Sequence, residues 1–219
     1  MMMGFALLGI ANRSWGASLS LSPLVDRSAN DSNFDGVWDT WEPLSTCLLA
    51  YNALPSTYNI RAALEFDLSA LPSNSVVSAA TFRICYGGAS GTRAETLQFN
   101  GYAGDGVLSF ADFQVNNQVG PLYNAFGPGN SSDFYEVPAT SFIQSLVTNH
   151  NRYAGFMVEN LWWNQTSFYS SRGGPSYSPS LVLQYTIVPE PSALLLAASA
   201  IVCLLPLALA HARRRMRTK

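Results

Sequence analysis

The chain has 219 residues, of which 48% are hydrophobic and only 12% are charged, and its formal net charge is −2 at pH 7. Its one lysine is Lys219, and the five basic residues after Ile187 exceed the single acid Glu190 by four, so the remainder carries −6. Nucleic acids and anionic membrane surfaces are bound by clustered cations, so this acidic composition argues against both as partners of the main domain.

The first 17 residues are expected to form a secretion signal of an atypical kind. Residues 5–11 are apolar, and small side chains follow near a possible cleavage site after Gly16 or Ala17. No Lys or Arg precedes the apolar run. Either the signal is unusual or the natural start lies upstream. Residues 18–187 are long enough for one domain with its own core, and no linker divides them.

Residues 31–42 read DSNFDGVWDTWE, which matches the calcium-loop spacing D-x-[DN]-x-[DN]-G-x5-E. Calcium requires six or more hard oxygen ligands around a tight turn, which Gly36 permits. The candidate ligands are Asp31, Asn33, Asp35, the Val37 carbonyl, Asp39 and Glu42. No helical pattern flanks the loop, and an ordinary Asp-Gly turn before an aromatic strand explains most of the same residues. A structural Ca²⁺ is therefore a hypothesis, and no cofactor is required.

The middle of the chain consists of short apolar runs separated by turn residues, which is typical of an all-β protein. The expected strands are residues 61–68, 76–86, 97–103, 153–159, 167–171 and 181–187. Phe82, Ile84 and Tyr86 alternate with Thr81, Arg83 and Cys85, which predicts one face on a core. Turns are expected at residues 71–74, 87–88, 104–106 and 127–129. Two facing sheets of this kind predict a β-sandwich or jelly roll.

One segment has a helical pattern. Residues 140–147 begin with a capping residue, Thr140, and continue with apolar side chains at helical spacing, so a short helix is expected there. Cys47 and Cys85 are the only cysteines before the C-terminal apolar stretch. In an oxidising compartment they could form one disulfide, and two unpaired thiols are an equally good interpretation.

Aromatic side chains offer a second candidate binding site. Trp162 and Trp163 are adjacent, so on a strand they would point to opposite faces, and only one could enter the core. The other could stack on a sugar ring or cover a loop, and Trp38 and Trp41 carry the same ambiguity. His150 is the only histidine before the tail, and no nucleophile motif, metal cluster or phosphate loop accompanies it. We therefore expect no enzymatic activity.

The strand residues also carry a family resemblance. Residues 61–72 read RAALEFDLSALP and residues 77–83 read VSAATFR, which resembles the DNRLRE-type domain of bacterial surface proteins. The resemblance continues in order through residues 142–146, 153–156 and 171–181, and residues 19–58 depart from it. It implies a jelly-roll β-sandwich, some of whose members bind polysaccharide without catalysing a reaction.

The C-terminal segment has three parts in order. Pro189, Glu190 and Pro191 form a stiff spacer, because proline removes a backbone donor and restricts the residue before it. Residues 193–210 are uncharged, and as a helix they would rise about 27 Å, close to the roughly 30 Å hydrocarbon core of a bilayer. A basic end follows, which should stay on the cytoplasmic side of the inner membrane: Arg213, Arg214, Arg215, Arg217 and Lys219.

This order of parts, from VPEPS at residue 188 to the basic end, resembles the PEP-CTERM sorting signal. The resemblance implies an exosortase as partner, with Pro189, Glu190 and Pro191 as recognition residues, and processing outside the inner membrane. We expect an exported, inner-membrane-anchored precursor that reaches the cell surface or extracellular matrix. A non-catalytic structural role is the leading hypothesis, a polysaccharide-binding module is the alternative, and a secreted hydrolase is the third.

Overall fold

Antiparallel strands dominate the computed structural model, which describes residues 16–33, 35–52, 59–90, 95–125, 133–161 and 165–188. Within these residues there are twelve strands, one α-helix and two short 3-10 helices. The strands are β1 Gly16–Leu21, β2 Val25–Asp31, β3 Thr40–Trp41, β4 Cys47–Asn52, β5 Asn59–Asp67, β6 Ser75–Ser90, β7 Glu95–Gly104, β8 Tyr123–Ala125, β9 Phe134–Pro138, β10 Tyr153–Asn160, β11 Gln165–Tyr169 and β12 Ser180–Ile187. The helices are η1 Phe110–Gln114, α1 Thr140–Thr148 and η2 Ser171–Gly173.

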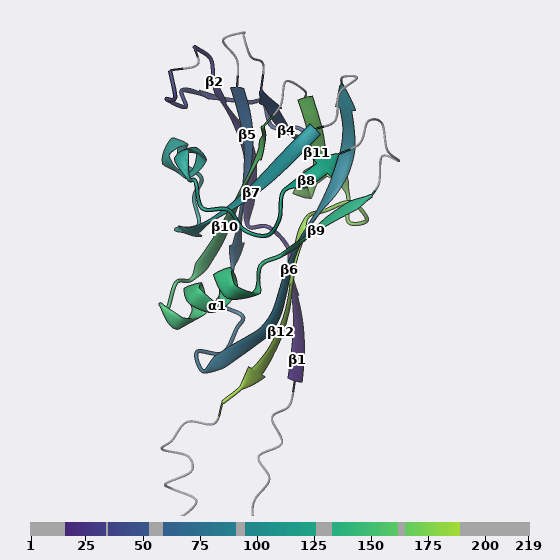
Figure 1. The fold of residues 1–219 in the computed structure, drawn as a ribbon. Coiled ribbons are helices and arrows are strands. Elements are labelled where there is room, and N and C mark those ends of the chain that lie inside the picture. Colours follow the sequence, from purple (N-terminus) through teal and green to yellow (C-terminus); the bar gives the residue numbers. More distant parts are fainter. Residues whose placement is uncertain are drawn as a thin grey trace, which may run out of the picture.

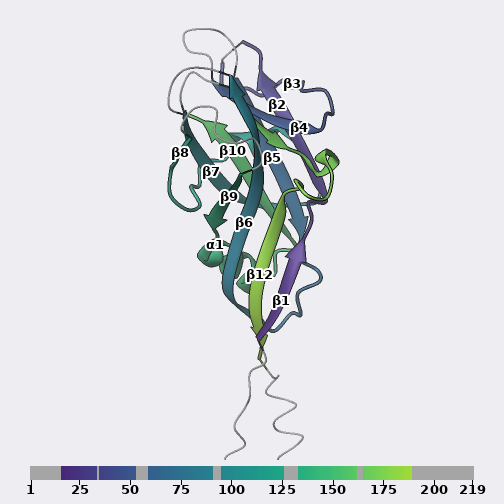
Figure 2. The same ribbon diagram turned by 90° about the vertical axis from the view of Figure 1, so that its right-hand side faces the viewer.

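The strands form two facing layers that share one long strand (Figures 1 and 2). One layer has the order β9-β6-β12-β1, and the other has the order β8-β7-β10-β5-β2-β3. The first part of β6 pairs with β12 and β9, and its last residues pair with β11, which leads through β4 to β5. The all-β prediction is confirmed, and the architecture is that of a β-sandwich.

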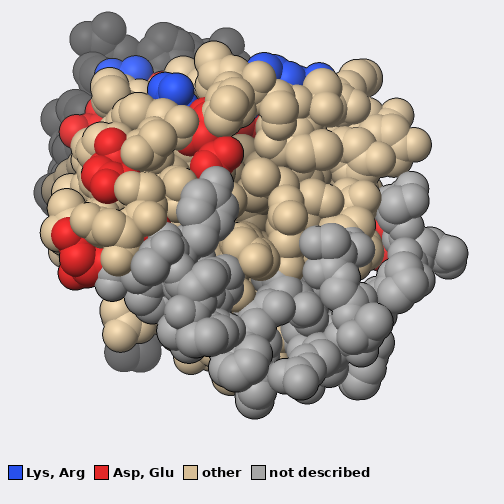
Figure 3. Space-filling model, turned by 90° about the horizontal axis from the view of Figure 1, so that it is seen from above, with Lys and Arg blue, Asp and Glu red and all other residues tan. Residues whose placement is uncertain are grey.

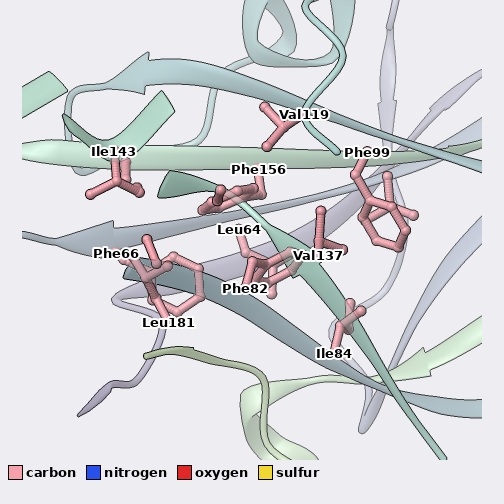
Figure 4. Packing of buried hydrophobic residues seen from close by; sticks show 14 of the residues in the cluster. Leu64, Phe66, Phe82, Ile84, Phe99, Val119, Val137, Ile143, Phe156 and Leu181 are labelled. Atoms are coloured by element: carbon pink, nitrogen blue, oxygen red, sulfur yellow. The ribbon is translucent and has the colours of Figure 1, made fainter. Parts of the chain in front are cut away.

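The core between the layers is built from alternate residues of the facing strands, as the period of two requires. Phe66, Phe82 and Phe156 meet at its centre, where the rings of Phe82 and Phe156 stack with centroids 4.4 Å apart (Figure 4). Ile143 and Leu146 of α1 are buried against the same core. The helix thus closes one end of the sandwich beside β6 and β10 (Figure 1).

The two ends of the domain lie at one pole of the molecule (Figure 1). Gly16 pairs with Thr186, and the Val188 N–H donates to the Asn74 carbonyl at 3.0 Å. We call this end the tail pole. The opposite end, the loop pole, is where β4, β6 and β10 end and where β5, β7 and β11 begin. The chain therefore enters and leaves the sandwich at the end opposite to most of its strand-to-strand connections.

The strands and the helix expected from the apolar pattern all form, with ends that differ by up to four residues. The pattern does not predict β1 to β4, β8 and β9. β3 and β8 have only two and three residues, and β2 and β9 contain charged residues. β1 and β4 have six residues each and no charge, and the prediction missed them. Gly16 and Ala17, expected at the end of a signal segment, belong to β1. The expected residues 1–15 of that segment lie outside the described residues.

The predicted turn at Gly87-Gly88 is wrong. Both residues lie inside β6, and the pairing with β11 shifts there, because Ser167 faces Gly88 while Phe168 faces Tyr86. Gly88 has φ of +140°, a value that side-chain-bearing residues rarely adopt. The glycine pair therefore makes a β-bulge that carries β6 from one layer to the other.

Two local predictions also need correction. Thr140 is the first residue of α1 and not its cap, and its hydroxyl instead accepts the Ala80 N–H at 3.0 Å. The alternation puts Cys85 on the polar side of its strand, but Cys85 is buried, as are Ile84 and Tyr86 beside it. Cys85 lies where β6 leaves one sheet for the other, so each face of the strand has protein against it.

Cys47 and Cys85 are both free thiols, so the possible disulfide is not formed. Cys47 lies on β4 and Cys85 on β6, and β11 runs between these two strands. Two strand spacings are about 9.5 Å, whereas a disulfide needs Cα atoms within roughly 7 Å. The strand order therefore keeps the two thiols apart.

Within the described residues, no helix is long and apolar enough to cross a bilayer. The helix expected at residues 193–210, the motif Pro189-Glu190-Pro191 and the basic end at residues 213–219 lie outside them.

Candidate functional site

The outer face of the β2-β5-β10-β7 sheet carries a second group of buried side chains, which we call the outer cluster. Its members are Ala29, Trp38, Ala63, Tyr102, Leu108, Phe113 and Met157. Strand residues supply the floor, while the segment after β7 and the β2–β3 connection lie over it. This face of the sheet is thus covered by protein near the loop pole.

A buried polar network lies beside the outer cluster. Arg61 pairs with Glu159 at 2.5 Å and donates to the Phe113 carbonyl at 2.6 Å. The Asn100 amide donates to Glu159 at 2.8 Å, and the Arg61 guanidinium lies 5.0 Å from the centroid of the Trp38 ring. Burial lowers the pKa of Arg61, and the carboxylate of Glu159 opposes that shift. The network fastens η1 to the sheet, which is a structural role.

A second arginine on the same face is less engaged. The Arg27 guanidinium lies 4.6 Å from the centroid of the Trp41 ring, and Trp41 stacks on Phe110 with centroids 4.5 Å apart. The Nε of Arg27 is buried without a hydrogen-bond partner. Among the described residues, the Arg27 guanidinium makes no ion pair. Arg27 is therefore held against an aromatic ring and not by a carboxylate of the described residues.

Arg27 borders a pocket of about 230 Å³ between β2, β4 and η2, whose wall also includes Glu42, Leu44, Ser45, Cys47 and Arg172. Arg172 is already engaged, since it pairs with the buried carboxylate of Asp26 at 2.8 Å and donates to the Ser45 carbonyl at 3.0 Å. Leu44 is exposed at the rim. The pocket thus offers the Arg27 guanidinium beside apolar and hydroxyl groups, which suits a small polar ligand with an acceptor oxygen.

The acidic loop at residues 31–42 connects β2 to β3 at the loop pole. Asp31 accepts the N–H groups of Asp35 at 3.2 Å and of Gly36 at 2.9 Å, and Asp35 accepts the Val37 N–H at 2.8 Å. Gly36 has φ of +84°, as the expected tight turn requires. Seen from above, acidic side chains gather on one side of this pole, with a few basic side chains nearby (Figure 3).

The remaining candidate ligands are also tied to the loop or to β2. Asn33 donates to Asp35 at 3.0 Å, and Asp39 accepts the Ser32 hydroxyl at 2.8 Å, which lowers the pKa of Asp39. The Glu42 N–H donates to the Ser28 carbonyl. In the part of the chain that the structure describes, no three His, Cys, Asp or Glu side chains come together as a metal site would require.

The calcium hypothesis stays a prediction that titration calorimetry of the full chain can test. If calcium binds, the wild type should give a calcium-binding heat. Asp35→Ala should abolish this heat. Asp133→Ala, a control at an exposed acid away from the loop, should retain it. No heat at millimolar calcium would contradict it.

The tryptophans have separate outcomes. Trp38 is buried in the outer cluster, so it is a core residue of that face. Trp41 is half-buried between Arg27 and Phe110. Trp162 and Trp163 lie outside the described residues, although β10 before them ends and β11 after them begins at the loop pole.

Asp105 and Asp112 are acids of the kind that a glycosidase uses in pairs, and each has a local structural partner. Asp112 accepts the Ser109 N–H at 2.7 Å and caps η1, and Asp105 accepts the Val107 N–H at 2.9 Å. His150 is exposed at the tail pole, far along the chain from both, with φ of +57° after α1. These residues do not form a shared site.

Sequence reasoning missed Arg27, Arg61 and Glu159, although Arg61 and Glu65 alternate with apolar residues in a predicted strand and so marked a polar face.

No protein-family model and no curated protein sequence matches this chain.

Proposed function

We propose that this chain is an exported surface or extracellular-matrix protein, sorted through a PEP-CTERM tail by an exosortase, with a non-catalytic structural role. The observation that carries the proposal is the order of parts after Ile187, where a Pro-Glu-Pro element, an uncharged stretch of membrane-spanning length and an arginine cluster follow one another. The proposal includes a membrane helix at residues 193–210 and a jelly-roll arrangement of the DNRLRE type for the sandwich.

The place where the chain leaves the sandwich supports this assignment. The chain leaves the sandwich at the tail pole, where β12 lies between β1 and β6 and Val188 is hydrogen-bonded to Asn74. The acidic loop and the Arg27 pocket lie away from that exit. An anchor in the tail would therefore hold the sandwich with its loop pole directed away from the membrane.

The test is processing of the full chain in a bacterium with an exosortase and in the same strain without it. With the enzyme present, the chain should lose its tail and leave the inner membrane. The triple variant Pro189→Ala, Glu190→Ala, Pro191→Ala should remain full-length and anchored, whereas Ser192→Ala, next to the motif, should be processed normally. Equal processing in both strains would contradict the proposal.

The alternative is a polysaccharide-binding module, favoured by Arg27, which stacks on Trp41 beside the pocket and has a buried Nε without a hydrogen-bond partner. Aromatic faces and guanidinium donors are common recognition groups for sugars and their acidic substituents. Glycan-array binding by the full chain in detergent should then fall on Arg27→Ala, Trp162→Ala or Trp163→Ala. Arg83→Ala is the matched control, because Arg83 also lies over an aromatic ring, that of Phe134. Turnover of a polysaccharide would instead show a hydrolase.

A further inference from the structure

β1 is the edge strand of its layer. Its residues pair with β12 in an unbroken register from Gly16 opposite Thr186 to Leu21 opposite Leu181. Among the described strands, none pairs with its other side. An edge of this kind presents a row of backbone N–H and C=O groups that can extend the sheet.

Soluble proteins usually protect such edges with charges, proline, a bulge or a short length. β3 has two residues and β8 has three, and β9 contains Glu136 and Pro138. β1 has six residues, reads GASLSL, and contains no charge, no proline and no bulge. At about 3.3 Å per residue, it offers an open edge of roughly 20 Å.

We propose that β1 pairs with β1 of a second copy of this chain, in antiparallel orientation about a two-fold axis. Directly opposed residues of an antiparallel pair either both direct their backbone groups to the shared edge or both direct them away from it, so in a self-pair they are of the same parity in the strand. Ala17, Leu19 and Leu21 of both copies then fall on one face, and Ser18 and Ser20 fall on the other.

The side chains that β1 presents favour a second copy over an unrelated strand. Leu19 and Leu21 are half-buried and pack against the edge of the core, so the partner's leucines would extend the same apolar layer. The opposite face would carry serines against serines or glycine. No charged pair is formed, so self-pairing meets no like-charge repulsion.

The antiparallel orientation has a consequence for anchored copies, which rests on the proposed function of the tail. β12 runs antiparallel to β1 and ends at the tail pole. In the pair, the two β12 strands therefore point in opposite directions, and so do the two tail exits. Copies whose tails lie in the same membrane cannot pair in this way, so pairing is reserved for copies released from it.

The test is the oligomeric state of the full chain in detergent, measured by sedimentation velocity. Wild type should dimerise reversibly. Ser18→Lys with Ser20→Lys should weaken dimerisation roughly tenfold or more, because lysines then oppose lysines across the edge. Ser18→Glu with Ser20→Glu should do the same, and mixing the two variants should restore a dimer. The matched control is Ser69→Lys with Ser73→Lys, away from β1. A monomeric wild type, or a dimer unaffected by the charges, would overturn the proposal.

A second measurement covers the case in which the charged variants fail to fold. The variants Ser18→Cys, Leu19→Cys and Ser20→Cys are made one at a time in a background that carries Cys47→Ser and Cys203→Ala. They should oxidise to intermolecular disulfides, most efficiently at the residue nearest the two-fold axis. Uniformly absent cross-links would overturn the pairing. Cross-links that persist between copies within one liposome membrane would overturn the antiparallel orientation. Neither result depends on processing by an exosortase, so the two proposals can fail separately.

Discussion

Glu65 is a carboxylic acid with no exposed surface, on the outer face of β5. It accepts the Gly106 N–H at 2.7 Å, while Asp112 and Asp105 lie near enough to disfavour a further negative charge. Burial is the main reason that the pKa of Glu65 is raised above its usual value. Tyr102 lies beside it, and burial raises the pKa of that hydroxyl as well.

Replacing Glu65 should change how stability depends on pH. Below the usual glutamate pKa of 4.5, both states are protonated and Glu65 imposes no charge-burial cost. As pH rises toward and through the raised folded pKa, the unfolded state ionises first, so stability falls. Glu65→Gln should therefore gain stability relative to wild type between acid and neutral pH, measured by urea unfolding. A difference independent of pH would contradict this assignment.

Asp67 lies on the same strand as Glu65, and its pKa is shifted in the opposite direction. Hydrogen bonds from Arg152 and from the Ser69 N–H lower the pKa of Asp67 to about 2. Its contribution is present above the usual value of 3.8 and is lost as pH falls toward 2. Asp67→Asn should therefore be less stable than wild type at neutral pH, and the difference in urea unfolding should shrink in acid. One titration series thus separates the two carboxylates, and a difference that grows in acid would be evidence against the Arg152 pairing.

The Arg61–Glu159 pair should be important for stability, because its side chains are only 21% and 11% exposed. Arg61→Met leaves the Glu159 carboxylate buried without its cation, at a cost of about 3 kcal/mol. Arg83→Met breaks an exposed pair with Glu136 and should cost less than about 1 kcal/mol. Chemical unfolding of both variants gives the comparison. Equal losses of unfolding free energy would show that the buried polar network around Arg61 is not structural.

At the scale of elements, the Tyr102 ring of β7 lies against Gly155, its cross-strand neighbour on β10. A Cβ at Gly155 would lie 2.2 Å from the Tyr102 ring, which is itself buried beside Glu65. Gly155→Ala should cost about 2–3 kcal/mol in thermal or chemical unfolding. Gly16→Ala is the control, since a Cβ at Gly16 would have no atom within 4 Å, and it should change stability by less than about 0.5 kcal/mol.

Strand existence could be predicted where apolar residues alternate over enough length, as in β5, β6 and β10. The same pattern predicted α1, because the helical period differs from the strand period. The pattern missed β2, since Asp26 and Asp31 are charged yet buried. Asp26 has its partner at Ser171, far along the sequence, and Asp31 accepts N–H groups of the loop that follows β2. Local pattern also misread Gly87-Gly88, because a bulge and a turn require the same backbone freedom.

At the scale of the whole molecule, strand order decides the state of the cysteines. Because β11 separates β4 from β6, all three cysteines of the full chain should react with a thiol reagent after unfolding without reductant. A disulfide between Cys47 and Cys85 would contribute about 2–4 kcal/mol, and since none forms, reductant should leave the melting temperature unchanged. A single reactive thiol would contradict the strand order.

The amino-acid sequence determined the all-β class, the main strands, helix α1 and the distinctive order of parts in the tail. These features depend on residues close together in the chain, whose periodicity and charge can be read directly. Only the tertiary structure decided that Arg61 meets Glu159, that Arg27 lies on Trp41 beside a pocket, that the cysteines lie apart and that β1 forms an open edge. Each of these depends on which strands become neighbours, and strand neighbours are chosen by packing between distant segments.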